Sequence, residues 1–341
     1  MSTAAAYNSY PLEALPAPAL PDESFTAAAA IPKKKYGWIS TALISIIAAA
    51  FFLFSAASVV AAWAISYPPV GALASNPMLA RGLAYEDVSF PSLDGSSQVN
   101  GWWIPSASGR TVVLSHGYGT NREEEWVPMY DIASLLHGLD YNVLMFDYGY
   151  ANAEHRLPAT GGVTESQQLL GALEFAKSQG SSKLIVWGFS MGAGTALQAA
   201  LQTDLIDGMI LDSTFIPDEE SIYYNINRYV NLPKSLATQW IRKLVPMFSG
   251  ASLDQIPSAE VQSTAFPYPI LLIHGTDDDK SPAAISENIA ASQTNPLSQL
   301  WSVPGAIHEM IFRTHPEEYV QRTTAFLQAI DADTLASIDA Q

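Results

Sequence analysis

The sequence of 341 residues contains no cysteine, which excludes disulfide bonds, thiolate zinc sites, iron–sulfur clusters and cysteine nucleophiles. Basic residues are also few, since 16 lysines and arginines stand against 33 aspartates and glutamates and give a formal net charge of −17. An acidic chain is poorly suited to phosphate backbones, so nucleic acid is not expected as a partner. Charged residues make up only 14% of the chain and hydrophobic residues 48%, an apolar balance for a purely soluble protein.

Charge is missing altogether between Lys35 and Arg81, and the most apolar part of this gap covers about residues 38–65. That length exceeds the roughly 20 residues needed to cross a bilayer. Tyrosine and tryptophan occur at both ends of the run, and three lysines at positions 33–35 precede it. These features predict a single-pass signal anchor over residues 36–66 of a cell-membrane protein, with a cytoplasmic N-terminus and the bulk of the chain outside.

Two other interpretations fit this run less well. A buried core helix fits poorly because the run is too long and too uniformly apolar. A cleaved signal peptide would find a processing site in "AAWA" near residues 61–64, but the run exceeds the usual apolar region of about 7–15 residues. An intact anchor is the favoured interpretation. The Ala- and Pro-rich residues 1–35 are expected to be a disordered cytoplasmic tail, and residues 67–80 a linker.

Beyond the linker, apolar runs rich in β-branched residues alternate with helical segments. This pattern predicts an α/β fold, an eight-stranded and mostly parallel sheet with helices on both faces. The first two strands should form an antiparallel hairpin turning at Asp94–Gly95. The predicted strands cover residues 84–91, 98–105, 111–116, 141–147, 183–188, 207–212, 268–274 and 298–303, with helices near 124–138, 163–179, after 190, 281–292 and 315–330.

Residues 213–266 interrupt the alternation with an aromatic and Pro-rich stretch that holds no clear strand. An insertion this long usually has helices of its own or a function, and it is expected to form a helical cap over the C-terminal edge of the sheet. A purely structural excursion is the alternative. The predicted domain therefore covers residues 81–330, followed by a C-terminal tail at 331–341.

The segment "VWGFSMGAG" places Ser190 between two glycines, after an apolar strand and before a small-residue helix. This strand–turn–helix context favours a nucleophile elbow over an ordinary turn serine. A sharp turn strains the serine backbone, and its neighbours must lack side chains to avoid collision. The Met191 N–H at the helix start would then be one donor to an oxyanion.

A nucleophilic serine needs a base, and the base needs an acid to orient it. His308, in "GAIHEM" after the last strand, follows both other groups in chain order. His315 is the rival, but "RTHPEEY" resembles a capping box at a helix start. His155 is expected in a loop and His137 in a helix, and neither position requires a catalytic role. For the acid, the residues alone leave four candidates open: Asp277, Asp278, Asp279 and Asp212.

A second oxyanion donor is expected where the third strand ends in "SHGYGT". Glycine-rich turns let a backbone N–H point into a site, and Tyr118 is the candidate donor there. His116, just before it, is expected to be structural.

These segments together resemble the alpha/beta-hydrolase superfamily, over about residues 81–330, and in particular membrane-anchored serine hydrolases of its prolyl-oligopeptidase and dienelactone-hydrolase-like branch. "SHGYGTNREEE" resembles the family's oxyanion turn and "WGFSMGAGTA" its nucleophile elbow. "IHGTDDDKSP" resembles its H-G-x-x-D-x-x-x-P element, whose aspartate falls on Asp278. The segment "DYGYANAEHRLPATGG" departs from the family by lacking an arginine–glycine turn after the fourth strand.

The sequence thus predicts a serine hydrolase with Ser190, Asp278 and His308 as the catalytic residues, Tyr118 and Met191 as oxyanion donors, and no metal or organic cofactor. The expected partners are a small-molecule ester, through carboxylesterase or lipase-like chemistry on an apolar substrate, and the membrane through residues 36–66. A peptidase or amidase of the same fold is one alternative, and a non-catalytic surface binding protein is another. The sequence predicts no particular oligomeric state.

Overall fold

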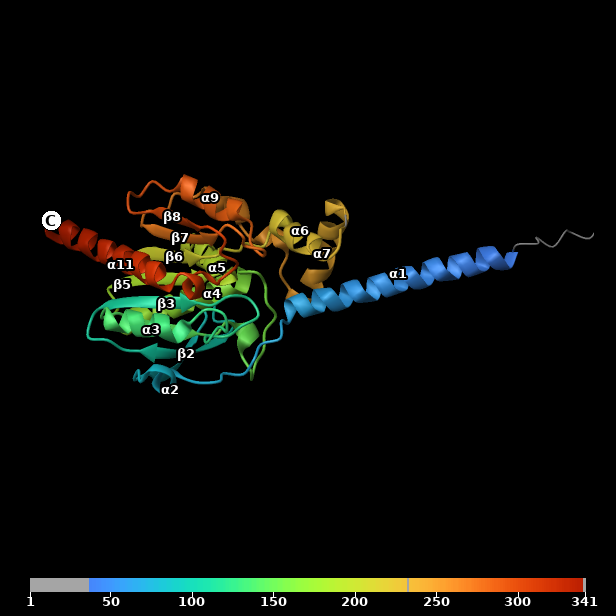
Figure 1. Cartoon of the computed structure of the whole chain (residues 1–341). Coiled ribbons are helices and arrows are strands. Elements are labelled where there is room, and N and C mark those ends of the chain that lie inside the picture. Colours follow the sequence, from blue (N-terminus) through green and yellow to red (C-terminus); the bar gives the residue numbers. More distant parts are fainter. Residues whose placement is uncertain (1–36, 232, 340–341) are drawn as a thin grey trace, which may run out of the picture. The chain divides into compact units, whose positions relative to one another are not determined.

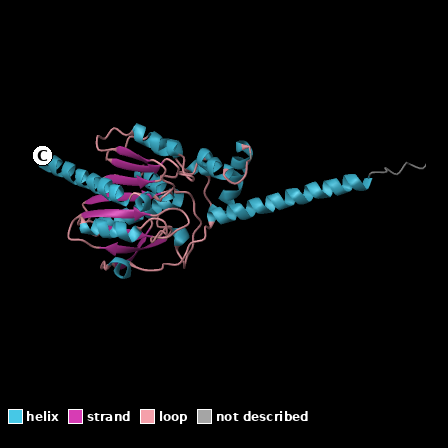
Figure 2. Cartoon of the chain, in the orientation of Figure 1, coloured by secondary structure: helices cyan, strands magenta, loops and turns pink. Residues whose placement is uncertain are grey.

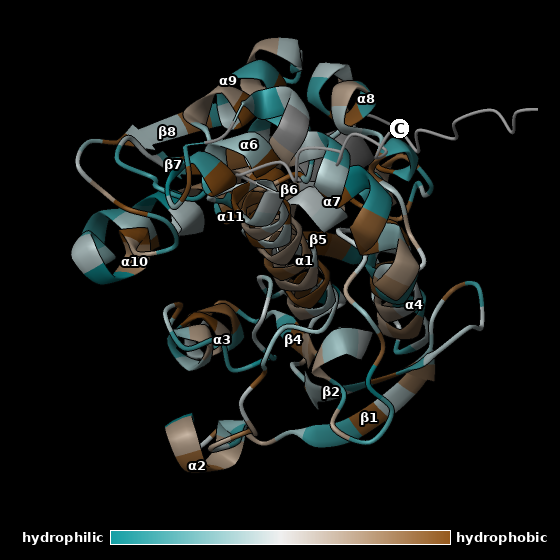
Figure 3. Cartoon of the chain, turned by 90° about the vertical axis from the view of Figure 1, so that its right-hand side faces the viewer, coloured by the Kyte–Doolittle hydropathy of each residue, from teal (hydrophilic) through white to brown (hydrophobic). Residues whose placement is uncertain are grey.

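The computed structural model describes residues 37–231 and 233–339, so the predicted disordered tail lies outside the described residues (Figure 1). The chain divides into two compact units, residues 1–51 and 52–341. The described part of the first unit is the beginning of helix α1 (Gly37–Ser66). Of the helices that the structure describes, α1 alone is long and apolar enough to span a membrane. Figure 3 shows this helix in pale to brown shades, as its lack of charged residues requires.

The second unit is built on an eight-stranded sheet with the order β1-β2-β4-β3-β5-β6-β7-β8 (Figure 2). Strand β2 pairs antiparallel with β1 and with β4, and all other neighbours are parallel. The predicted eight-stranded, mostly parallel sheet is therefore confirmed. The strands are β1 (Glu86–Pro91), β2 (Gln98–Ile104), β3 (Arg110–Ser115), β4 (Asn142–Phe146), β5 (Lys183–Phe189), β6 (Gly208–Asp212), β7 (Ile270–Gly275) and β8 (Gln299–Val303).

Helices bury both faces of this sheet, which explains why its central strands are apolar without alternation. Within β3, Val113 belongs to the core on one face, while Val112 and Leu114 belong to the core on the other. The first core is completed by α4 (Val163–Ser178), α5 (Met191–Ala200), α8 (Ser258–Ser263) and α9 (Ala283–Ser292), and the second by α3 (Met129–Gly138), α10 (Ile311–Thr314) and α11 (Pro316–Asp339). The short elements α2 (Pro77–Arg81), η1 (Gly149–Ala151) and η2 (Leu253–Gln255) lie in connections.

The strand register brings the ends of three strands together at one edge of the sheet. Ser115, the last residue of β3, is level with Gly188 of β5, and Phe189 of β5 is level with Asp212 of β6. The loops that follow β3, β5 and β6 therefore begin side by side. In an open parallel sheet this carboxyl edge is where ligands bind.

Two predicted helix boundaries differ from the structure. The helix expected near residues 124–138 begins only at Met129, because Pro128 lacks an N–H and closes the preceding loop instead. The last helix, expected near 315–330, continues to Asp339, since no glycine or proline interrupts the sequence there.

The capping box expected between Thr314 and Glu317 is wrong. Helix α11 begins at Pro316, one residue later than such a box requires, and the Thr314 hydroxyl donates to the carbonyl of Met310 instead. His315 lies between α10 and α11, so it remains the residue that precedes the last helix.

The predicted cap segment, residues 213–266, holds helices α6 (Glu219–Asn227) and α7 (Lys234–Ser249) besides η2 and α8. Asp218 caps α6 by accepting from the Ser221 N–H at 2.8 Å. Helix α7 has hydrophilic and hydrophobic sides, visible as teal and brown in Figure 3. The segment is thus helical, as expected, while the exact domain boundaries stay a prediction.

Candidate active site

Ser190 occupies a strained turn between β5 and α5. Its φ of 49° and ψ of −118° lie where residues other than glycine rarely occur. A Cβ at Gly188 would lie 2.6 Å from Ala193 Cα, and one at Gly192 would overlap the carbonyl oxygen of Ser115. Both flanking positions therefore require glycine because backbone approaches them too closely for any side chain.

Three of the residues singled out from the sequence lie in one hydrogen-bonded row. Ser190 Oγ lies 2.8 Å from His308 Nε2, and His308 Nδ1 lies 2.7 Å from Asp278 Oδ2 and 2.9 Å from Oδ1. Ser190 follows β5, Asp278 follows β7 and His308 follows β8. All three side chains are buried. The row can pass a proton from a hydroxyl to an imidazole whose other nitrogen is fixed by a carboxylate.

The surroundings of this row tune its two titratable groups. Burial opposes the charged imidazole, but the hydrogen bond that His308 Nδ1 donates to Asp278 and the negative charge of Glu309 outweigh it, so the pKa of His308 is raised. Burial disfavours the Asp278 carboxylate, yet the bond to His308 and those from the Lys280 and Ser281 N–H groups lower its pKa on balance. The pair therefore favours an ionised acid beside a readily protonated base.

The two aspartates beside Asp278 point elsewhere. Asp277 accepts from the Thr276 hydroxyl at 3.1 Å, and Asp279 forms an ion pair with Arg228. The structure thus brings one of the three adjacent carboxylates to the imidazole.

Asp212, the fourth acid considered, lies at the end of β6 and contacts other groups. It accepts from the Tyr319 hydroxyl at 2.7 Å and from the Ser213 hydroxyl at 2.9 Å. Burial raises the pKa of Asp212 to about 7. These contacts make it a buried structural acid behind the row.

Of the other histidines, His274 of β7 lies beside the row, with Nε2 3.6 Å from Asp278 Oδ2 and Nδ1 2.9 Å from the Ser286 hydroxyl, and four are placed elsewhere. His116 accepts from the Tyr148 N–H at 3.0 Å, and burial lowers its pKa to about 4, in line with a structural role. His137 is in α3, His155 is exposed in the loop after η1, and His315 follows α10.

The two predicted oxyanion donors flank the same cavity as Ser190. Met191 is the first residue of α5, whose N–H has no acceptor within the helix. Tyr118 lies in the turn after β3, which is fixed by bonds from the Tyr150 hydroxyl to the Gly117 carbonyl at 2.7 Å and from the Tyr118 hydroxyl to the Ile65 carbonyl at 2.6 Å. Both residues therefore line the cavity that contains Ser190, on structurally held backbone.

A pair of buried glutamates beside the row was not expected from the sequence. Glu124 and Glu309 are neighbours, since a Cβ built on Gly117 would meet Oε1 of both, and neither of these oxygens has a hydrogen-bond partner among the residues that the structure describes. Burial together with the charge of Glu309 raises the pKa of Glu124 well above its usual range. Glu124 also accepts from the Gly117 N–H at 3.1 Å. Both glutamates have positive φ angles, 30° and 57°. Nothing local distinguishes Glu124 from the two glutamates that flank it, so no sequence signal could have revealed the pair.

An ion pair holds the loop that carries Glu124. Arg122 donates to Asp147 through its side chain at 2.7 Å and through its backbone N–H at 2.8 Å, with both side chains almost wholly buried. The Arg122 guanidinium also stacks on Trp102, 4.8 Å from the ring centroid. Asp147 is the first residue of the stretch in which the sequence departs from the resembled family, and it anchors the turn that follows β3.

Ser190 opens into a cavity of about 610 Å³ that is lined mainly by apolar side chains. Residues 213–266 supply much of its wall. Aliphatic, proline and aromatic residues of the lining include Ile65, Pro68, Pro69, Trp126, Phe215, Pro217, Ile222, Ile226, Ile241, Val245, Pro246 and Ile256, and the polar ones include Arg242, Lys280 and Glu309.

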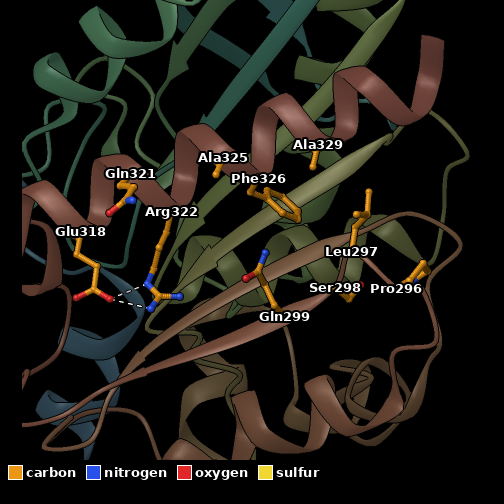
Figure 4. A pocket seen from close by; sticks show the side chains of 10 residues that line it. All are labelled: Pro296, Leu297, Ser298, Gln299, Glu318, Gln321, Arg322, Ala325, Phe326 and Ala329. Atoms are coloured by element: carbon orange, nitrogen blue, oxygen red, sulfur yellow. Dashed lines mark hydrogen bonds and ion pairs between the residues drawn. The ribbon is translucent and has the colours of Figure 1, made fainter. Parts of the chain in front are cut away.

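A second hollow of about 490 Å³ lies between β8 and α11, away from Ser190 (Figure 4). Its lining carries the ion pair between Glu318 and Arg322 and contains no residue of the row. Over residues 37–231 and 233–339, no three His, Asp or Glu side chains are grouped to hold a metal ion.

Residues 112–322 match a family described as "Alpha/beta hydrolase family". Two relatives are similar along most of their length. The uncharacterised protein YfhR of Escherichia coli K12 is 27% identical over 253 residues, which cover 71% of this chain and 80% of YfhR. An uncharacterised Mycobacterium tuberculosis protein is 28% identical, with 72% and 79% covered. An uncharacterised membrane protein of Saccharomyces cerevisiae is 26% identical over 146 residues, 42% of this chain and 50% of that protein.

Among solved structures, the esterase Pf2001 of Pyrococcus furiosus superimposes with a TM-score of 0.63 at 25% sequence identity. The match covers 77% of this chain and 97% of that enzyme. A thermophilic esterase from Thermogutta terrifontis, with a TM-score of 0.51 and 20% identity over 72% of this chain and 99% of that one, shares the fold.

Proposed function

The chain belongs to the alpha/beta hydrolase family, and from this premise we propose that it is a membrane-anchored serine hydrolase that cleaves carboxylic esters. The observation that carries the proposal is the row of Ser190, His308 and Asp278, with distances of 2.8 and 2.7 Å. We assign it to the branch similar to prolyl oligopeptidase and dienelactone hydrolase, which the sequence motifs resemble.

In the proposed reaction Ser190 Oγ attacks the ester carbonyl while His308 Nε2 takes its proton. Asp278 holds the Nδ1 proton and stabilises the imidazolium that forms. His308 then returns the proton to the departing alcohol, which leaves an acyl group on Ser190. A water molecule, deprotonated by the same imidazole, releases the acid and restores the serine. The net change is ester plus water to carboxylic acid plus alcohol.

The tetrahedral intermediate places a negative charge on the former carbonyl oxygen. We assign its stabilisation to the backbone N–H groups of Met191 and Tyr118, which lie at the start of α5 and in the turn after β3. The positive end of the α5 dipole adds to this stabilisation. Backbone donors held in place need no reorganisation as the charge develops, which is what makes such a site effective.

An ester with an apolar acyl or alcohol part is the proposed substrate. The cavity beside Ser190 is lined chiefly by aliphatic side chains and prolines, which favour hydrocarbon over peptide groups. The similar Pyrococcus furiosus protein is named an esterase, which supports ester over amide cleavage. Parallel assays with p-nitrophenyl esters and aminoacyl-nitroanilides separate this proposal from a peptidase.

The test of the nucleophile uses a fluorophosphonate probe on the purified full chain. Wild type should be labelled, and Ser190→Ala should lose labelling and ester hydrolysis together. Ser252→Ala is a matched control, because Ser252 lines the same cavity and should leave labelling intact. Persistent labelling of Ser190→Ala would overturn the assignment.

We also propose that α1 is an uncleaved signal anchor, with the N-terminus in the cytoplasm and the hydrolase domain, residues 81–330, outside. The support is its 30-residue apolar length and the lysines at 33–35 that precede it. An N-terminal tag retained on the membrane-bound protein, and protected from protease in intact cells, is the expected result. Loss of the tag from the mature protein would indicate cleavage.

A further inference from the structure

Helix α1 is longer than a membrane span requires. Its 30 residues extend about 45 Å, whereas about 20 residues suffice for a bilayer core. Residues 52–66 belong to the same compact unit as the sheet. The Phe54 ring meets the Trp240 ring of α7 edge-on with centroids 5.4 Å apart, and Ala62 and Ser66 are buried. The C-terminal half of α1, residues 52–66, therefore packs as part of the hydrolase body.

The end of α1 is bonded directly to the loops around Ser190. The Ile65 carbonyl accepts from the Tyr118 hydroxyl at 2.6 Å, and the Ser66 carbonyl accepts from the Ala159 N–H at 2.7 Å. The last carbonyls of a helix have no partner within the helix. Here two loops that line the cavity supply them, so the helix end and the cavity wall form one structure.

The predicted linker, residues 67–80, continues this attachment rather than acting as a free tether. Asn121 donates to the Gly71 carbonyl at 3.0 Å. Glu123 accepts from the Ala74 N–H at 2.5 Å and from the Ser75 N–H at 2.7 Å. The Asn121 and Glu123 side chains both come from the loop after β3, which also carries Tyr118. The segment that leaves the apolar helix is thus fastened to the turn beside Ser190.

The end of the apolar helix and the cap segment both contribute to the lining of the cavity. Ile65, one residue from the end of α1, lines it together with Pro68 and Pro69, and α7 contributes Ile241 and Val245. Apolar surface therefore continues from α1 into the cavity.

The cap segment adds large apolar side chains that face outward. Met247 of α7 is 74% exposed, and Tyr229, in the turn before α7, is 80% exposed. Exposed apolar groups on an amphipathic helix are typical of contact with a lipid surface.

We propose that the cavity takes its substrate directly from the bilayer: a long-chain carboxylic ester dissolved in the membrane, whose acyl chain slides along Ile65 and α7 until its carbonyl reaches Ser190. This inference rests on the proposed function. Its acid product keeps the long chain and returns to the bilayer, while the smaller alcohol leaves through water.

Access from the bilayer has a physical advantage over access from water. Each methylene of a chain lowers the aqueous concentration of the free ester on the order of fourfold relative to the membrane. A long-chain ester is therefore scarce in water and concentrated beside α1. A cavity whose wall contains the end of the anchor receives it without exposing the chain.

The test uses the full chain reconstituted in phosphatidylcholine vesicles, with 4-methylumbelliferyl palmitate either in the same vesicles or in separate ones. At equal total ester, the same-vesicle rate should exceed the separate-vesicle rate at least tenfold. 4-Methylumbelliferyl acetate, which reaches the enzyme through water, should give equal rates in both arrangements. Equal rates for the palmitate, with the acetate still cleaved, overturn the inference alone; no Ser190-dependent cleavage of either ester overturns the proposed function itself.

A matched pair of variants tests the route. Ile65→Trp narrows the cavity beside the end of α1 and should lower the ratio of palmitate to acetate hydrolysis at least fivefold. Val60→Trp adds the same ring to the same helix at a position that is 63% exposed and outside the cavity lining, and should leave the ratio unchanged. Val245→Trp repeats the narrowing from α7 if Ile65→Trp does not fold. An unchanged ratio in a folded variant with a narrowed cavity contradicts the route.

Discussion

Glu309 Oε2 lies 3.8 Å from His308 Nε2, the same nitrogen that contacts Ser190 Oγ at 2.8 Å. The imidazole thus faces two carboxylates, Asp278 through Nδ1 and Glu309 near Nε2. Glu309 is also a neighbour of Glu124, whose pKa is raised well above its usual range by burial and by the charge of Glu309. The negative charge of Glu309 also raises the pKa of His308.

Replacing that charge should shift the pH profile. The negative charge of Glu309 helps to raise the pKa of His308, and His308 must be neutral to accept the serine proton. Glu309→Gln should therefore lower this pKa and move the acidic limb of the kcat/KM profile to lower pH, while the plateau kcat falls because the imidazolium is less stabilised. A profile measured from pH 4 to 9 with a soluble ester checks this. A structural role alone would lower the plateau without moving the limb.

Asp278→Asn should lower kcat about 10³- to 10⁴-fold, because an amide cannot hold the required tautomer of His308 or stabilise its charged form. Asp277→Asn is the matched control, since that side chain contacts Thr276 instead, and it should change kcat less than twofold. Steady-state kinetics on p-nitrophenyl acetate distinguish the two. A comparable loss in both variants would point to damage of the whole loop.

Tyr118→Phe removes the hydroxyl that reaches the Ile65 carbonyl and keeps the backbone N–H that is proposed to bind the oxyanion. A neutral hydrogen bond contributes about 1 kcal/mol, so kcat/KM should fall about fivefold. Because a looser turn would hold the oxyanion donor less precisely, the loss should be found in kcat. Tyr229→Phe, at an 80% exposed tyrosine, should have no effect. Wild-type kinetics in Tyr118→Phe would show that the tether does not position the turn.

Arg122→Met should destabilise the fold by about 3–5 kcal/mol, because it leaves the buried Asp147 carboxylate without its partner. Arg81→Met breaks the ion pair with Asp131, whose side chains are both more than 40% exposed, and should cost less than about 1 kcal/mol. Urea unfolding of both variants gives the comparison. Equal small losses would mean that Asp147 finds another partner or takes up a proton.

Local patterns in the sequence were enough to predict the sheet and the sharp turn at Ser190. Continuous apolar strands separated by helical segments predicted a parallel sheet covered on both faces, since only full burial allows a strand without polar alternation. The sharpness of the turn predicted that the two residues flanking Ser190 must be glycines. In the structure the backbone approaches both positions too closely for a side chain.

Other features depend on contacts between distant residues. Three adjacent aspartates cannot be told apart along the chain, because their loop decides which carboxylate turns toward His308; family resemblance, not local pattern, singled out Asp278. The sequence predicted a helix from about residue 124, but the ion pair between Arg122 and Asp147 holds a loop there, and the helix begins only at Met129. Glu124 and Glu309 are separated by most of the domain, so their pairing has no local signature.

The sequence by itself determined the class of fold, the elbow around Ser190 and an apolar helix long enough to cross a membrane, because each follows from periodicity, turn geometry or length within one segment. From the sequence, that helix, the linker and the cap were predicted as separate segments, with no contact expected among them. Only the tertiary structure decided that the end of α1 accepts hydrogen bonds from the loops around Ser190 and lines the same cavity. Such contacts join residues tens to hundreds of positions apart, and they exist only once the sheet has brought the ends of its strands together.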